Sequence, residues 1–506
     1  MPAINQQIKQ TTLKIEQVIK TYLSPAWLSV ILIGLITSWV LFVLPANGVA
    51  NNGDFNKWFE AAGLYPLQGF TEDGSGYFTR QYGILQYYNP DSSTWLSSQS
   101  AFLAVALFLN KLFYSHVIFD MRFLGGLYLL YYLGAIYLLT SSITGKGRQR
   151  SDYLLALLVV FILGDTSYTL YFHSFYVLAL VLITTVYLFA LSIAFYRRLY
   201  PTKFMLSLFL VNAFLLITLH QQFLYMVLFL LAWLVLISFT SRLFSTKMFA
   251  LFGTFTILLG ASITFSFINL GNRNYQHFQA FSQGLMKSTT QDIDLEHQQL
   301  NSQYALVAGE DYFAEYLPID VDGNEIFTDF YQPLDQFWLL TYYLEHPVHL
   351  VSLMKTAMPQ VSQVQDPNLG NLEKSQGEPA GTKSHFFNGY QTLRSAYFPK
   401  TFGFYLVFSF IILILYVPLI VKSWRQHNRW RMLPAIFILS FLMMTYLNYL
   451  TAIINYGIVG ITLRLFIIPL IFDLILIFTL AELLHRNLWR PVDPLMNERG
   501  GVSHEK

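Results

Sequence analysis

The sequence predicts an all-α polytopic membrane protein with about ten transmembrane helices. Hydrophobic residues make up 54% of the 506 residues and charged residues only 12%, whereas about a quarter of the residues in a soluble domain are charged. Ten apolar runs approach the length of about 20 residues that a helix needs to cross a bilayer. Lys and Arg gather in every second connection between these runs, which is typical of cytoplasmic loops.

Residues 1–27 are predicted to form an amphipathic helix on the cytoplasmic surface. Aliphatic residues recur among polar neighbours from Ile8 to Leu23, a pattern typical of helices that lie in the membrane interface. A cleaved signal peptide is the alternative, because the first apolar run ends close to the small residues Gly48 and Ala50. The polar leader is too long for a signal peptide, so we expect the first span to be retained.

The apolar runs divide the chain into two membrane modules. The N-terminal module, 28–268, holds seven of them, the C-terminal spans occupy 402–484, and 485–506 form a cytoplasmic tail. The runs lie near 28–46, 122–143, 152–167, 174–196, 204–220, 222–241, 248–268, 403–421, 432–449 and 462–484.

A further apolar run at 98–114 is predicted to lie in the interface and not to span. If it crossed the membrane, the basic loop with Lys146, Arg148 and Arg150 would face outward, against the positive-inside rule. The interfacial interpretation leaves every basic loop and both termini in the cytoplasm.

Two long loops then lie outside the cytoplasm. The first, 47–120, carries the sequence NNGDF, and the second, 269–401, is long enough to form a small extracytoplasmic domain. Within the second loop, 362–384 is rich in Gly, Pro, Asn, Ser and charged residues, so we expect a mobile segment there.

Polar and aromatic residues gather in the turns on the outer side. Each has a common structural explanation, because carboxylates cap helices, buried histidines pack, and arginines at span ends reach toward headgroups. Their coincidence on one face favours a functional site. The candidates are Asp54 and Asp165 as catalytic residues, and Arg80, Tyr168, His173, Ser174, Tyr176, His220, Gln221 and Arg464 as substrate-binding residues.

These turns resemble those of a known family. NGDF after the first span, D..Y...F.SFY between the third and fourth, and the Gln-containing turn after the fifth are similar to bacterial hexose transferases of the S-layer-glycan (WsfD-like) type, in the GT-C superfamily of polytopic glycosyltransferases. In the second loop, YQHFQAFSQGLMKS, YALVAGEDYF and YYLEHPVHLV add to the resemblance.

The resemblance implies an inverting transfer in the bacterial inner membrane. A sugar would pass from a polyprenyl-phosphate donor to an extracytoplasmic glycan or wall-polymer acceptor, and a donor-lipid synthase and a flippase would be partners. Because a phosphate leaves readily, the chemistry needs one general base to take the acceptor proton, and Asp54 fits this role with Asp165 across the cavity. Arg464, helped by Arg80 and His220, would bind the phosphate.

Other interpretations stay open. A divalent cation could bind between Asp54 and Asp165 or between Glu72 and Asp73, although no metal-ligand spacing supports one and no metal ligand is assigned. A lipid-linked-glycan flippase would need ionisable groups within the spans, but only Asp473 lies in the middle of one, and a polysaccharide polymerase would carry an Arg-rich outer loop. The net charge of +2 favours no nucleic-acid partner.

Overall fold

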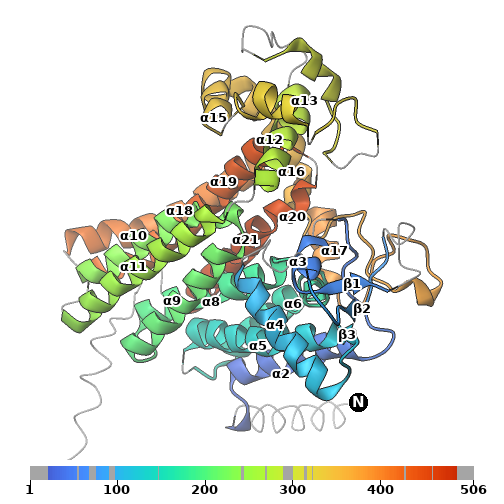
Figure 1. Ribbon diagram of the computed structural model, residues 1–506. Helices are drawn as coiled ribbons and strands as arrows, with labels where there is room; N and C mark the ends of the chain where they lie inside the picture. The colour runs from blue at the N-terminus through green and yellow to red at the C-terminus, as the bar shows by residue number, and fades with distance from the viewer. Residues whose placement is uncertain are drawn as a thin grey trace, which may run out of the picture.

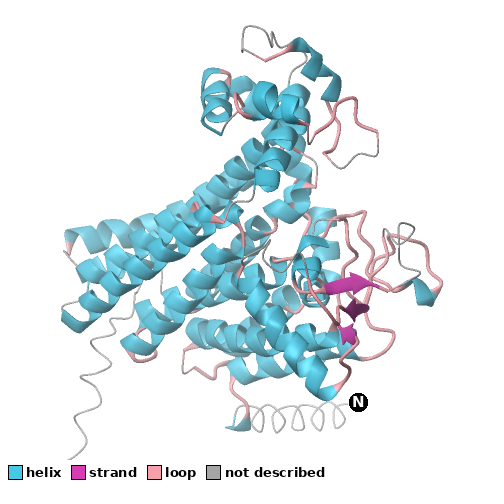
Figure 2. Cartoon of the chain, viewed as in Figure 1, coloured by secondary structure: helices cyan, strands magenta, loops and turns pink. Residues whose placement is uncertain are grey.

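The computed structural model describes residues 21–486, apart from 54–55, 68–75, 90–96, 146, 241–243, 268–269, 289–299, 313–315, 322, 335, 427–428 and 459. The described chain is a helical bundle, with a group of short helices and a small β-sheet at one end (Figures 1 and 2). Residues 1–20 of the predicted amphipathic helix and residues 487–506 of the predicted tail lie outside the described residues.

A helix occupies each of the ten predicted positions. Within the described ranges, eight of the helices are long and apolar enough to cross a membrane, and α6 with the turn 166–173 that follows it, bent by 51°, can count as a ninth. The polytopic helical fold is therefore as predicted. The ten helices are α2 (Pro25–Phe42), α5 (Arg122–Thr144), α6 (Arg150–Leu163), α8 (Leu178–Arg197), α9 (Thr202–Leu219), α10 (Met226–Thr240), α11 (Phe244–Ser266), α18 (Phe402–Arg425), α19 (Leu433–Tyr456) and α21 (Ile467–Leu484).

Helix α8 is the central helix of the bundle. It is buried along almost its whole length and packs against α5, α9, α19 and α21. A helix that is apolar on every side needs such surroundings. By contrast, α18 exposes Val407, Phe410 and Ile414, the surface expected of a helix that faces lipid.

The two ends of the bundle differ in character. At one end, Arg148 donates to the carbonyl of Thr21 at 2.9 Å and His485 lies 2.8 Å from Asp152. The start of α2, the α5–α6 connection and the end of α21 therefore lie together, and we name this the basic end. The opposite end, which holds the long loops, is named the loop end.

Helix α4 (Ser98–Phe113) begins and ends at the loop end. The hydroxyl of Ser97, just before α4, donates to the carbonyl of Leu219 at the end of α9, at 2.8 Å. Near its other terminus, the Asn110 side chain donates to the carbonyl of Ile118, also at 2.8 Å. Because both termini are at the same end, α4 does not carry the chain across the bundle, as predicted from the basic loop that follows it.

A three-stranded antiparallel sheet, which the all-α prediction missed, lies at the loop end. It consists of β1 (Leu64–Pro66), β2 (Gln81–Ile84) and β3 (Ile118–Asp120), in that order. Tyr65 pairs with Gly83, and a Cβ atom at Gly83 would lie 2.2 Å from the Tyr65 ring, so only glycine lets this ring cross the strand. Strands this short leave little periodicity in the sequence.

The loop 269–401 divides into two parts and is not one compact domain. Its first part extends from the ends of α11 and α19, and its second part runs back to the sheet (Figure 1). The first part contains α12 (Leu270–Gln279), the π-helix η3 (Ala280–Leu285), α13 (Met286–Ser288), η4 (Ser302–Val307), α14 (Asn324–Ile326), η5 (Phe327–Tyr331), α15 (Gln336–Glu345) and α16 (Pro347–Val361); the second contains η6 (Lys374–Gln376) and α17 (Gly389–Tyr397).

The segment 362–384, which composition predicted to be mobile, is bound to the first outer loop. We name it the strap. Its backbone carbonyls accept from Ala50 N, Gly48 N and Phe78 N at 2.9–3.0 Å. The prediction of a mobile segment differs from the structure because composition carries no information on hydrogen bonds between loops that are distant in sequence.

Candidate functional site

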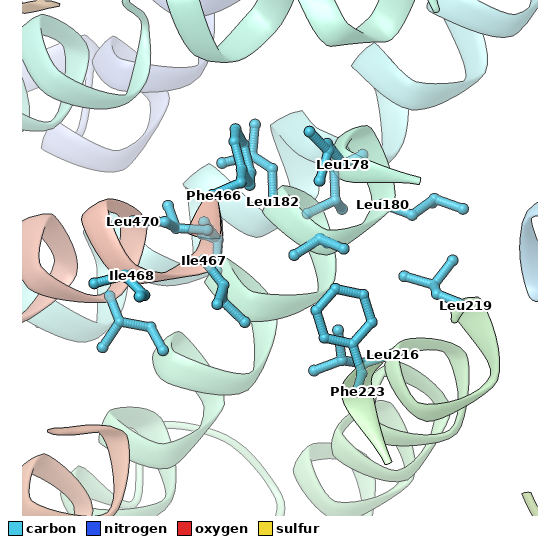
Figure 3. Packing of buried hydrophobic residues seen from close by; sticks show 14 of the residues in the cluster. Leu178, Leu180, Leu182, Leu216, Leu219, Phe223, Phe466, Ile467, Ile468 and Leu470 are labelled. Atoms are coloured by element: carbon cyan, nitrogen blue, oxygen red, sulfur yellow. The ribbon is translucent and has the colours of Figure 1, made fainter. Parts of the chain in front are cut away.

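The turns of the candidate site lie at the loop end, next to a cluster of buried apolar side chains. Figure 3 shows the starts of α8 and α21 packed together, with Leu182 beside Phe466, and with Leu219 from the end of α9 and Phe223 from the turn that follows it nearby. All of these side chains are buried. This packing fixes the turns that carry the predicted polar residues.

The segment that leads to Asp54 is fixed to the turn between α6 and α8. The hydroxyl of Tyr176 donates to Asn52 Oδ1 at 2.8 Å and accepts from Asn52 N at 3.1 Å. The Nδ1 atom of His173 lies 2.9 Å from the carbonyl of Asn47. Asp54 itself lies outside the described residues, two positions beyond this anchored segment.

His173 and Ser174 have packing roles in this turn. The His173 ring is fully buried and stacks on Phe78, with ring centres 5.7 Å apart. The Ser174 hydroxyl donates to the carbonyl of Tyr171 at 2.8 Å. Both residues therefore support the turn that anchors the segment before Asp54.

Asp165 caps two helices with one buried carboxylate. Oδ1 accepts from the backbone N and the hydroxyl of Ser167, at 2.9 and 2.6 Å, and so caps α7 (Thr166–Thr169). Oδ2 accepts from Gln391 N at 3.0 Å, in the first turn of α17. Asp165 is fully buried. It has the capping role that is common for such carboxylates, and it ties α17 to the bundle.

Tyr168 belongs to a buried cluster around Asp473, away from any open surface. Its hydroxyl donates to Asp473 at 2.7 Å, the Tyr390 hydroxyl donates at 2.5 Å, and Arg394 forms an ion pair at 3.1 Å. Asp473 and Arg394 are 2% and 1% exposed. Asp473 is recognisable in the sequence as a charge within a span, but nothing in the sequence links it to an arginine in the second outer loop.

A second polar group connects η2 (Gln221–Phe223), α12, α19 and α20 (Ile461–Leu465). Gln276 donates to the Tyr456 hydroxyl at 2.7 Å and lies 3.5 Å from Gln221 Oε1. The guanidinium of Arg464 lies 4.2 Å from the centre of the Tyr456 ring, and the Gln222 side chain donates to the Arg464 carbonyl at 2.5 Å. The fold thus brings the predicted Gln221 and Arg464 together, and it adds Gln276 and Tyr456, which were not predicted.

Aromatic rings connect this group to the anchored segment. Phe466, two residues after Arg464, lies 5.2 Å from Tyr171, and Tyr171 lies 6.1 Å from Tyr176 between ring centres. The predicted His220 precedes η2 and accepts from Gln222 N at 3.2 Å. The rings of Phe466, Tyr171 and Tyr176 therefore form a row that leads from the turn of Arg464 to the segment before Asp54.

Arg80 lies on the other side of the anchored segment, against the strap. Its Nε atom is 3.4 Å from Glu373 and 3.8 Å from Asp120. Asp120 also pairs with Arg122 at 2.9 Å. Burial would raise the pKa of Asp120, but hydrogen bonds from Arg122 and the charges of Arg122 and Arg80 together hold it below its usual value.

No group of three or more His, Asp or Glu side chains with the geometry of a metal site occurs among the described residues. Glu72 and Asp73, like Asp54, lie outside them.

Comparison with known proteins supports a family but no activity. No curated protein and no solved structure matches the chain. A family model described as the YfdI N-terminal transmembrane domain matches residues 9–499, which is nearly the whole sequence. The chain therefore belongs to the YfdI N-terminal transmembrane domain family.

Proposed function

We propose that this protein is an inverting membrane glycosyltransferase of the GT-C type. It transfers a sugar, a hexose by resemblance, from a polyprenyl-phosphate donor to a cell-envelope glycan or wall polymer. The loop end faces away from the cytoplasm of a bacterial cell, in its inner membrane. A donor-lipid synthase and a flippase supply the donor.

One observation carries this proposal: the row of Tyr176, Tyr171 and Phe466 rings, which connects the segment before Asp54 with the turn of Arg464. The backbone before Asp54 is bonded to Tyr176 at one end of these rings, and Arg464 lies two residues before Phe466 at the other end. A general base and a phosphate-binding cation are the two groups that the transfer needs most.

In the proposed reaction, Asp54 takes the proton of the acceptor hydroxyl as its oxygen attacks the anomeric carbon. The bond from that carbon to the phosphate oxygen breaks, and the phosphate leaves with the electron pair. Arg464 stabilises the charge that develops on the phosphate. Asp165 contributes by holding the α7 turn and α17 in place, since both of its oxygens accept hydrogen bonds there.

The buried charges favour transfer over transport. A transporter carries ionisable groups in its spans that are available to substrate or ion. Asp473 instead pairs with Arg394 and accepts from two tyrosines. A polymerase would carry a cationic outer loop. The loop 269–401 has only two arginines, and one of them, Arg394, is buried in the ion pair with Asp473.

The direct test measures sugar transfer by the purified protein in proteoliposomes, with a panel of labelled polyprenyl-phosphate hexoses and a cell-envelope glycan fraction as acceptor. Asp54→Asn should lower the rate by about 10² to 10⁴-fold, because the amide cannot take a proton. Glu60→Gln is the matched control, an exposed carboxylate on α3 (Asn56–Ala61), and should transfer normally. Transfer at the normal rate by Asp54→Asn would refute the assignment.

The same assay separates the base from the phosphate-binding residue. Arg464→Lys keeps the charge but loses the planar donor fork, so it should raise the donor concentration needed for half-maximal rate. Asp54→Asn should lower the maximal rate and leave that concentration nearly unchanged. An Arg464→Ala variant with normal donor dependence would remove Arg464 from the site.

A further inference from the structure

An apolar ridge covers the outer surface of α15 and α16 in the second loop. We name it the ridge: Leu340, Leu344, Val348 and Val351, whose exposed fractions are 42%, 73%, 76% and 46%. Exposed positions on a helix in water are normally polar, and isolated exposed apolar residues need no explanation, whereas contiguous ones indicate a binding surface. The four residues follow helical spacing on each side of the turn at His346 and Pro347.

Packing beneath α15 determines that the ridge faces outward. Leu339 and Tyr343 on the same helix are buried, and a Cβ atom placed on Gly284 of η3 would lie 3.3 Å from the Tyr343 hydroxyl. Rotation of α15 to hide Leu344 would expose these residues. The ridge is therefore a fixed feature of the fold.

Packing ties α16, which carries half of the ridge, to α19 and to the start of α18, a helix with the apolar surface expected to face lipid. The Tyr449 hydroxyl of α19 donates to the carbonyl of Met354 in α16, and the Tyr449 ring stacks on Phe402 at the start of α18. From there α18 exposes Leu406 and Phe410, by 45% and 65%. Figure 1 shows α15 projecting to the side of α12 and α16, on the side where α18 and α11 lie.

Amphipathic aromatic rings accompany the ridge. Trp338 stacks on Tyr342 at 5.6 Å, and Tyr342 stacks on His346 at 4.5 Å between ring centres. Trp and Tyr are enriched at the headgroup level of membranes, where one part of the ring is in apolar and the other in polar surroundings. Trp338 and His346 are only partly buried.

We propose that the ridge rests on the bilayer surface at the loop end, with its aliphatic side chains among the upper acyl chains. The partner is the lipid itself and neither another protein nor a second copy of this chain. Helices α15 and α16 then form an interfacial wing of the membrane domain. This inference does not depend on the proposed glycosyltransferase activity.

Single-cysteine variants test the proposal cleanly, because the chain has no cysteine of its own. A polarity-sensitive fluorophore is attached to Leu344→Cys or to Val348→Cys in proteoliposomes of phosphatidylethanolamine and phosphatidylglycerol. Quenching is measured with aqueous iodide and with lipids that carry a nitroxide near the headgroup or near the end of the acyl chain. Glu378→Cys, exposed on the strap, is the aqueous control, and Phe410→Cys, on the apolar surface of α18, is the control for a position among the acyl chains.

Both ridge probes should be quenched by the nitroxide near the headgroup and shielded from iodide. The Glu378 probe should show the reverse, and the Phe410 probe should also resist iodide. Iodide quenching of the ridge probes equal to that of Glu378 would overturn the proposal. Shielding from both quenchers, together with cross-linking between copies through Leu344→Cys, would overturn it in favour of a protein interface.

Discussion

At the scale of single residues, the Arg394–Asp473 pair shows how the second loop is attached to the spans. Removing one partner of a buried ion pair leaves an uncompensated charge and typically costs about 3–5 kcal/mol. Arg394→Met alone should therefore strongly lower the unfolding temperature in detergent. The double variant Arg394→Met with Asp473→Asn should recover much of the loss, because no unpaired charge remains. If the loss in the double variant equalled the sum of the losses in Arg394→Met and in Asp473→Asn, the pair would not be coupled.

A second residue prediction concerns Lys383, whose ammonium group donates to the carbonyls of Asp366 and Leu369 within the strap. Burial lowers the pKa of Lys383 to about 8, with Asp366 partly opposing the shift, while an unfolded lysine titrates near 10.4. Between these values the unfolded chain binds more protons, so the free energy of unfolding should increase as pH rises through this window. Lys383→Met should remove this increase. A pH dependence unchanged in that variant would contradict the prediction.

At the scale of elements, the strap depends on Asn371. Its side chain donates to the Gly48 carbonyl at 2.9 Å and accepts from Ser384 N at 3.2 Å. Asn371→Ala should release the strap and increase trypsin cleavage after Lys374, which is exposed. Asn368→Ala, an exposed neighbour, is the matched control. Equal cleavage of the wild type and both variants would show that the Asn371 side chain does not hold the strap in place.

The elements also show what the sequence could and could not predict. Long apolar runs predicted the spans, because every helix that crosses the bilayer needs such a run, whatever its position in the chain. The basic loop at Arg148 predicted that α4 would not cross. The sheet, the capping of α17 by Asp165 and the Asp473–Arg394 pair could not be predicted, since each depends on contacts between segments far apart in sequence. Gln221 and Arg464 lie close together because both belong to turns at the loop end, and their predicted role in substrate binding stays a prediction.

At the scale of the whole molecule, the fold separates the basic end from the loop end, and labelling can test which faces the cytoplasm. In intact spheroplasts, an impermeant maleimide should label Glu378→Cys and not Arg148→Cys. Arg148 is exposed at the basic end, and the positive-inside rule predicts that this end faces the cytoplasm. After permeabilisation both should react. Labelling of Arg148→Cys in intact cells would reverse the orientation.

The Arg394–Asp473 pair also constrains the order in which the protein is assembled. Asp473 lies in α21, the last helix among the described residues, and it leaves the ribosome well after Arg394. Until α21 is inserted, Arg394 on α17 has no counter-charge, although Asp165 can already accept from Gln391 N in the first turn of α17. We therefore expect the burial of Arg394 to be a late step of biogenesis. A nascent chain stalled before residue 473 should expose Arg394 to solvent, and chain termination there would leave every earlier span inserted but the loop end open.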